Sequence, residues 1–105
     1  MASPIWLLEN STANETGGWK STNGMKGAKT FHAILTGSGA LTSTPVIEVS
    51  NDGVNAVTLP LWTFTLSGNT LVSEGKALLD EWVWYRAKNA NLTGTNAKLN
   101  LIMGV

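Results

Sequence analysis

Short apolar runs separated by polar turn residues make up most of the chain, and their spacing is that of β-strands. In the segment 62–66 (WTFTL), large apolar residues alternate with threonine, so Trp62, Phe64 and Leu66 are predicted to face the core. The segment Ala97–Met103 places its apolar residues on one face by the same alternation. Both segments are therefore predicted to be strands with one buried face.

Four further segments are predicted to be strands, because they are rich in β-branched or aromatic residues and are bounded by turn residues. They are Thr30–Thr36, Pro45–Val49, Ala56–Leu59 and Trp82–Lys88. The first two are predicted to form a hairpin or a neighbouring pair, with Gly37–Gly39 ending the first strand. The segment Leu71–Leu79 is assigned no regular structure, because Gly75 weakens both a strand and a helix interpretation.

Turn signals divide these segments at regular intervals. The sharpest is Ser50–Gly53 (SNDG), because Asn and Asp tolerate left-handed backbone and Gly adopts positive φ without steric cost. Ser67–Asn69 and Asn91–Thr95 are two further predicted turns. About seven strands without a convincing helix predict an all-β antiparallel β-sandwich, of either the immunoglobulin-like or the jelly-roll kind.

The N-terminal part of the chain differs in composition from the rest. Ile5–Leu8 is a short apolar run that suits either a first strand or an anchoring arm. Glu9–Lys29 is rich in Asn, Ser, Thr and Gly and is predicted to be a loop with at most one short strand at Trp19. We therefore expect one domain, with an arm and loop in residues 1–28 and the sandwich in residues 29–105.

Composition narrows the classes of function. The 105 residues include 7 Lys and Arg, 7 Asp and Glu and no Cys, which excludes disulfides and thiolate metal sites and argues against nucleic-acid binding. The start of the chain lacks a basic leader and is too short in apolar residues to span a bilayer, so synthesis in the cytoplasm and no membrane partner are expected. A domain of this size gains stability from oligomerisation or from docking on a larger body.

Candidate catalytic chemistry is sparse. His32 is the single imidazole and no spacing brings a carboxylate to it, so a partly exposed strand histidine is the preferred interpretation. Asp52, Asp80 and Glu81 lie in or beside turns without the ligand spacing of a Ca²⁺ loop. No phosphate-binding glycine motif is present. We therefore predict no enzyme activity, no cofactor and no metal.

The five tryptophans are more informative, because tryptophan is enriched in protein interfaces. Trp84 and Arg86 lie on one face of the predicted strand Trp82–Lys88, and Tyr85 lies on the other. In one alternative Val83, Tyr85 and Ala87 point inward, and Trp82, Trp84 and Arg86 form an exterior patch. In the other, Trp82 and Trp84 pack inward and Arg86 lies at the rim. Trp19 is expected to dock on the sandwich or, by a slight preference, on another chain. The candidate interface residues are Trp6, Trp19, Lys20, Met25, Trp84 and Arg86.

The order of strands and turns along the chain carries a family resemblance. It rests on Thr30–Leu35, Val46–Val49, the SNDG turn, and the ending from Trp84–Ala87 (WYRA) through Leu92–Thr95 (LTGT) to Ala97–Met103. Over roughly residues 5–105, the chain resembles the small β-sandwich structural proteins of tailed bacteriophages, most closely their capsid decoration, or cement, proteins. Similar turns and endings also occur in phage tail and fibre modules.

The resemblance implies a non-enzymatic virion protein on the capsid surface. Such a protein attaches as a homodimer or homotrimer at symmetry axes of the head and clamps neighbouring subunits of the major capsid protein. The segment from Trp6 to Met25 and the face around Trp84 and Arg86 are the expected contacts, an assignment that rests on our interpretation of these residues.

Three alternatives to a decoration protein stay open. The first is a structural or adhesion module of a phage tail or fibre. The second is a carbohydrate-binding module, which needs coplanar exposed aromatic rings beside polar groups on a rigid face. The third is an enzyme, which needs a pocket containing His32 and a carboxylate.

Overall fold

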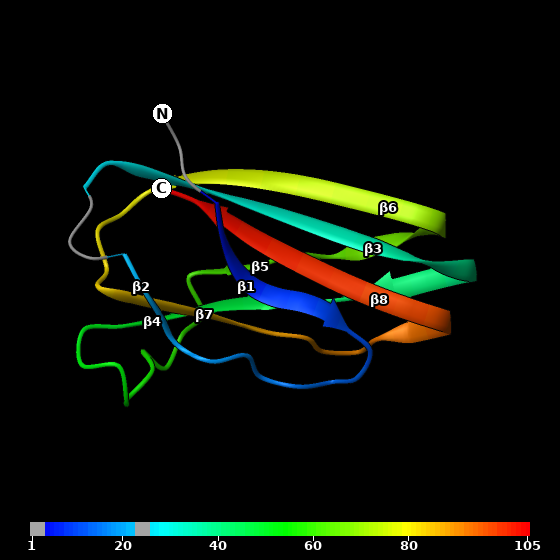
Figure 1. Ribbon diagram of the computed structural model, residues 1–105, viewed down its shortest axis with the longest axis horizontal. Coiled ribbons are helices and arrows are strands. Elements are labelled where there is room, and N and C mark those ends of the chain that lie inside the picture. The colour runs from blue at the N-terminus through cyan, green and yellow to red at the C-terminus, as the bar shows by residue number, and fades with distance from the viewer. Residues whose placement is uncertain (1–3, 23–25) are drawn as a thin grey trace.

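The structure is a computed structural model that describes residues 4–22 and 26–105, and these residues form two antiparallel sheets with no helix (Figure 1). Sheet A has the spatial order β1 (Pro4–Ser11), β8 (Thr93–Gly104), β3 (Ala28–Ser43) and β6 (Leu66–Leu79). Sheet B has the order β2 (Lys20–Ser21), β7 (Trp84–Lys88), β4 (Val46–Ser50) and β5 (Trp62–Thr63). The all-β prediction is confirmed, with eight strands in place of about seven. The described residues include no helix that is long and apolar enough to cross a membrane.

The inner faces of the two sheets share one apolar core. The rings of Phe31 in β3 and Tyr85 in β7 meet across the sheets with centroids 6.0 Å apart. Phe64 and Leu66 are buried as predicted, and so is the predicted face of β8, which consists of Ala97, Leu99, Leu101 and Met103. Period-two alternation therefore predicted β8 correctly, but the predicted strand 62–66 is divided: Trp62–Thr63 is β5 in sheet B, and Leu66 begins β6 in sheet A. The turn predicted at Ser67–Asn69 is also wrong, because these residues lie within β6 and pair with β3.

The strand β3 is longer than predicted. It passes through Gly37–Gly39 to Ser43, with a register shift at the glycines and positive φ at Gly39. The glycines thus form a bulge inside a strand instead of ending it. The predicted pairing of this segment with Pro45–Val49 is also wrong, because β3 lies in sheet A and β4 in sheet B.

Two assignments in the middle of the chain are corrected. Leu71–Leu79, expected to be irregular, lies within β6 and pairs residue by residue with β3. A long regular partner outweighs the weak local preference of Gly75. Ala56–Leu59, expected to be a strand, lies in the loop between β4 and β5, which is attached by hydrogen bonds of Val57 N–H to Val49 O (2.9 Å) and Leu61 N–H to Ile47 O (2.9 Å).

The first described residues belong to the two sheets. β1 pairs with β8, and its side chains Leu7 and Leu8 are buried in the core, so the first-strand alternative is correct and a free arm is not seen in the described residues. The following loop is attached to β7 by the Gly17 N–H, which donates to Ala87 O at 2.8 Å. Apolar side chains and backbone hydrogen bonds therefore hold residues 4–22 against the sheets.

A buried polar network fixes the start of this loop. Asn89 is fully buried, donates from its amide nitrogen to Ser11 Oγ (3.1 Å) and accepts from Ser43 Oγ (2.8 Å). Its backbone N–H donates to Glu15 O at 2.8 Å. These bonds join β1, β3 and the segment after β7, which satisfies polar groups that burial would otherwise penalise.

Candidate functional site

The outer face of β7 carries Trp84 and Arg86. Tyr85 and Ala87 are fully buried, so the residues that alternate with them point away from the core. The open choice between the two faces is thus decided in favour of an exterior Trp84 and Arg86. Trp82, which was predicted to share this exterior patch, instead precedes the strand and is partly buried against the core.

Arg86 is held from two sides on this face. Its Nε donates to Glu48 Oε1 on β4 at 2.7 Å, and both side chains are about a quarter exposed. Its Cζ lies 4.3 Å from the centre of the Trp19 ring, a distance suited to a cation–π contact. The register explains both contacts, because Glu48 pairs with Arg86 and Lys20 pairs with Tyr85, which leaves Trp19 beside Arg86.

These four residues, Trp19, Glu48, Trp84 and Arg86, are called the outer-face cluster below. Trp19 docks on its own chain through the contact with Arg86, and contact of this residue with another chain stays a prediction. The cation–π contact orients the guanidinium, so the cluster presents an ordered mixture of aromatic and charged surface.

A tight turn covers one side of Trp84. Ser50 Oγ donates to Asp52 Oδ1 (2.7 Å), which also accepts from the backbone N–H groups of Val54 (2.8 Å) and Asn55 (2.8 Å). These hydrogen bonds, led by the one from Asn55, hold the pKa of Asp52 well below its usual range. Gly53 has φ +73, and a Cβ there would lie 3.0 Å from the Trp84 ring, so glycine is required on both counts.

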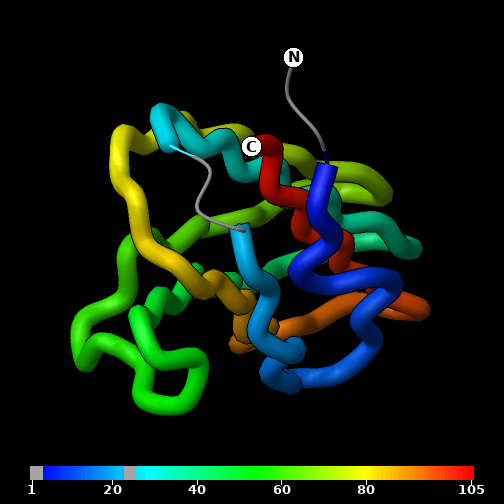
Figure 2. The backbone as a smooth tube through the Cα atoms, turned by 60° about the vertical axis from the view of Figure 1, so that its left-hand side comes forward, coloured from blue at the N-terminus to red at the C-terminus, as the bar shows by residue number. Residues whose placement is uncertain are grey.

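The loop after this turn exposes apolar side chains that sequence analysis missed. Val54 is 74% exposed and Leu59 is 77% exposed, and the loop extends away from the sheets (green in Figure 2). The sequence held a signal for Leu59, since it precedes Pro60, which removes a backbone donor from any strand. Exposed apolar side chains beside an aromatic cluster are typical of a contact surface.

The remaining predicted site residues are distributed differently. Lys20 is exposed in β2, next to Trp19. Trp6 is 45% exposed, but it lies on β1 in the other sheet, paired with Ile102. Met25 lies outside the described residues. The structure thus brings Trp19, Trp84 and Arg86 to one face and separates Trp6 from them. Lys20 pairs with the inward-facing Tyr85, so it lies on the opposite side of β2 from Trp19.

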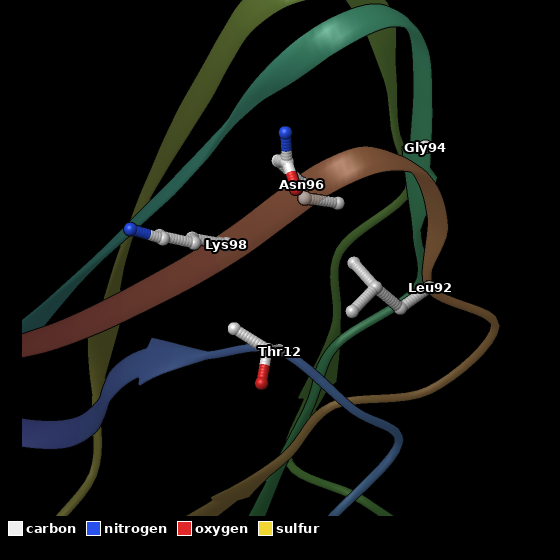
Figure 3. A pocket seen from close by; sticks show the side chains of 6 residues that line it. Thr12, Leu92, Gly94, Asn96 and Lys98 are labelled. Carbon is white, nitrogen blue, oxygen red and sulfur yellow. The ribbon is translucent and has the colours of Figure 1, made fainter.

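A hollow lies beside the start of β8 (Figure 3). It has a volume of about 520 Å³ and is lined by Thr12, Leu92, Gly94, Asn96, Ala97 and Lys98. This lining contains one cationic side chain and no imidazole or carboxylate. The acid–base pair required by the enzyme alternative is therefore not assembled there.

Titratable groups elsewhere have structural surroundings. His32 is exposed on β3 and is not among the residues that line the hollow. The Tyr85 hydroxyl donates to Asp80 Oδ1, and burial, followed by this bond, raises the pKa of Tyr85 above its usual range. Lys29 is buried and its Nζ donates to Gly27 O (2.8 Å) and Asp80 O (3.3 Å). Within residues 4–22 and 26–105, no three histidine or carboxylate side chains are grouped as metal ligands would be.

Comparison with known proteins adds no relative. No protein-family model matches the chain, and neither a curated protein nor a solved structure is significantly similar to it.

Proposed function

We propose that this protein is a non-enzymatic decoration protein of a tailed-bacteriophage capsid. It binds the outside of the head, where it staples neighbouring subunits of the major capsid protein. It is made in the host cytoplasm, ends up on the virion surface, acts as a homo-oligomer and needs no cofactor. The support comes from the family resemblance of the sequence together with the surface features described above.

The observation that carries the proposal is the outer-face cluster beside the exposed apolar loop. Arg86 is oriented by Glu48 and Trp19, and Leu59 is exposed in the loop that follows the Asp52 turn. Tryptophan and arginine are the residues that dominate binding energy in protein interfaces. Ordering them before binding lowers the entropic cost of forming a complex. Such a surface suits a protein partner better than a small substrate.

Stapling follows from mass action. A protein that binds the assembled lattice and not the free subunits stabilises the lattice, and the stabilisation increases with the ratio of free protein concentration to Kd. A homo-oligomer repeats the contact, so modest contacts at each site combine into tight overall binding. The neutral net charge places no strong repulsion between neighbouring copies on a shell.

The carbohydrate-binding alternative is less well supported. Sugar stacking needs two or three exposed ring faces on one rigid surface. Arg86 occupies one face of Trp19, Gly53 packs on Trp84, and Trp6 lies on the other sheet. The same surface features would also suit a tail or fibre module. The experiment below distinguishes that function from decoration of the capsid.

The test is co-sedimentation of the purified protein with expanded, emptied heads of the encoding phage, beside unexpanded procapsids and purified tails. Decoration predicts saturable binding to expanded heads, with a stoichiometry that matches two-fold or three-fold positions. Binding to tails alone would move the protein to the tail or fibre. Binding to none of the three particles would contradict a virion contact of this kind.

A further inference from the structure

The strand β6 forms the only long regular sheet edge in the described part of the chain. In sheet B, the edge strands β2 and β5 have 2 residues each. In sheet A, β1 is interrupted by two register shifts, whereas β6 has 14 residues and lies at the margin of the sheet (Figure 1). Short and bulged edges resist pairing with another chain. The β6 edge lacks both features from Leu71 to Leu79, where its register with β3 is unbroken.

The residue types in this part of β6 are arranged symmetrically about Gly75, with charges of opposite sign on its two sides. Around Gly75, the residues 71–79 (LVSEGKALL) run apolar, apolar, small, acidic, then basic, small, apolar, apolar. Antiparallel pairing of the strand with a second copy would reverse one of the two sequences. This arrangement therefore makes the strand complementary to itself.

Geometry restricts the possible registers. Side chains alternate between the two faces of a strand, and residues opposite each other in an antiparallel pair point to the same face. A two-fold axis that relates two β6 strands must therefore pass through a residue position and not between two residues. An axis at Glu74 would oppose two carboxylates, and an axis at Lys76 would oppose two ammonium groups, which is destabilising. An axis at Gly75 places Glu74 of each copy opposite Lys76 of the other.

We propose that β6 pairs antiparallel with β6 of a second copy of this chain, about a two-fold axis at Gly75. The two four-stranded sheets A then join into one continuous sheet of eight strands. The homo-oligomer of the proposed function is then a two-fold dimer. The biological role of this dimer rests on the proposed function. The pairing itself follows from the sheet edge and is tested without capsids, so its failure and that of the decoration proposal are distinguishable.

Exposed apolar side chains support the same register. Leu71 is 61% exposed and Leu79 is 82% exposed, and they alternate onto the outer face of β6 with Gly75. In the proposed register Leu71 of one copy lies opposite Leu79 of the other, so each covers its partner. Val72 and Leu78, both partly buried against the core, are paired in the same way on the inner face. Charge and apolar complementarity therefore agree on a single register.

The direct test is disulfide trapping, because the chain contains no Cys of its own. In Gly75→Cys, the two thiols lie opposite each other across the axis, within the reach of a disulfide. A Cβ at Gly75 meets only the Phe31 carbonyl oxygen at 3.7 Å, so the substitution fits the strand. The matched control is Ser73→Cys on the same face, whose two thiols are about 13 Å apart along the paired strands.

The expected result is a covalent dimer of Gly75→Cys on mild oxidation and little or none of Ser73→Cys. Equal trapping of both variants, or none of Gly75→Cys, would overturn the register. Light scattering of the unmodified protein up to millimolar concentration is expected to show a monomer–dimer equilibrium. A strict monomer or a trimer would overturn the pairing altogether, because edge pairing about a two-fold axis closes at two chains.

Charge reversal supplies a second test that needs no cysteine. Glu74→Lys opposes lysines at two symmetry-related positions and is expected to raise the dissociation constant of the dimer by about tenfold or more. The double variant Glu74→Lys with Lys76→Glu restores opposite charges and should recover the dimer. Glu9→Lys, on the other edge of sheet A, is the matched control. The proposed pairing would be contradicted if the dimer were lost in both the single and the double variant. It would also be contradicted if the dimer persisted in both.

Discussion

At the scale of residues, Asp52 organises the turn that covers Trp84. Its carboxylate accepts four hydrogen bonds, from the backbone of Val54 and Asn55 and from the side chains of Ser50 and Asn55. These bonds favour the ionised form and lower the pKa of Asp52. A group whose pKa is lowered on folding contributes stability that is complete above its unfolded pKa, about 4, and is lost as the pH falls below that value.

This linkage predicts a pH-dependent difference between the wild type and Asp52→Asn. The wild type should be more stable than the variant by a constant margin above about pH 5, and the margin should narrow below about pH 4. Urea unfolding of both proteins between pH 2.5 and pH 7 (~0.5 unit steps) measures it. A margin that is independent of pH would show that ionised Asp52 does not stabilise the turn.

Asn89 stabilises the fold through polar contacts instead of apolar ones. Replacing it by Ala leaves Ser11 and Ser43 in a buried site without their amide partner, and we expect a loss of about 1–3 kcal/mol in the free energy of unfolding. Denaturant unfolding gives the value, with exposed Asn51→Ala as the control that should change it by less than about 0.5 kcal/mol. If Asn89→Ala lowers the free energy of unfolding by no more than Asn51→Ala does, the network adds nothing to stability.

At the scale of elements, β1 and β2 are parts of the two sheets. A deletion of residues 1–25 removes both strands, together with the buried side chains Leu7 and Leu8. We expect this fragment to lose cooperative folding, because each buried leucine contributes about 2–5 kcal/mol and typical total stability is about 5–15 kcal/mol. Circular dichroism during thermal melting provides the measurement. A cooperative transition at a melting temperature near that of the full chain would show that residues 1–25 are a separable arm.

The elements that sequence predicted well were those with strict alternation against the core. Ala97–Met103 showed it, and the alternate apolar residues of this strand lie in the core as expected. In 62–66, Phe64 and Leu66 are buried and Trp62 is partly buried, but the segment is divided between β5 and β6. β6 was missed because its inner side alternates Val72, Glu74 and Lys76, so no apolar stripe is visible. Its strand structure depends on pairing with β3, which is a non-local property. The same holds for the glycine bulge in β3, where local residues indicate a turn and the partner strands impose continuation.

At the scale of the whole molecule, part of the candidate site was predictable. The alternation along Trp82–Lys88 restricted Trp84 and Arg86 to one face, and the burial of Tyr85 decides which face is exterior. The partners of Arg86 were not predictable, because Glu48 and Trp19 reach it from strands that are distant in sequence. Trp6 was grouped with them by residue type, and the topology places it on the other sheet.

The outer-face cluster is proposed to bind a protein lattice, and the variant Arg86→Ala separates binding from folding. Arg86 is part of a partly exposed ion pair and a cation–π contact, so the free energy of unfolding of the isolated protein should fall by less than about 2 kcal/mol. In an interface, truncation of an anchoring arginine costs at least about tenfold in affinity. Lys98→Ala, on sheet A, is the matched control.

The most direct measurement is therefore the dissociation constant of wild type, Arg86→Ala and Lys98→Ala for expanded heads of the encoding phage, by quantitative co-sedimentation. We expect saturable binding of the wild type and of Lys98→Ala, and binding at least about tenfold weaker for folded Arg86→Ala. Equal affinities of all three proteins would remove the outer-face cluster from the contact. Absence of wild-type binding to the heads would contradict the decoration function itself.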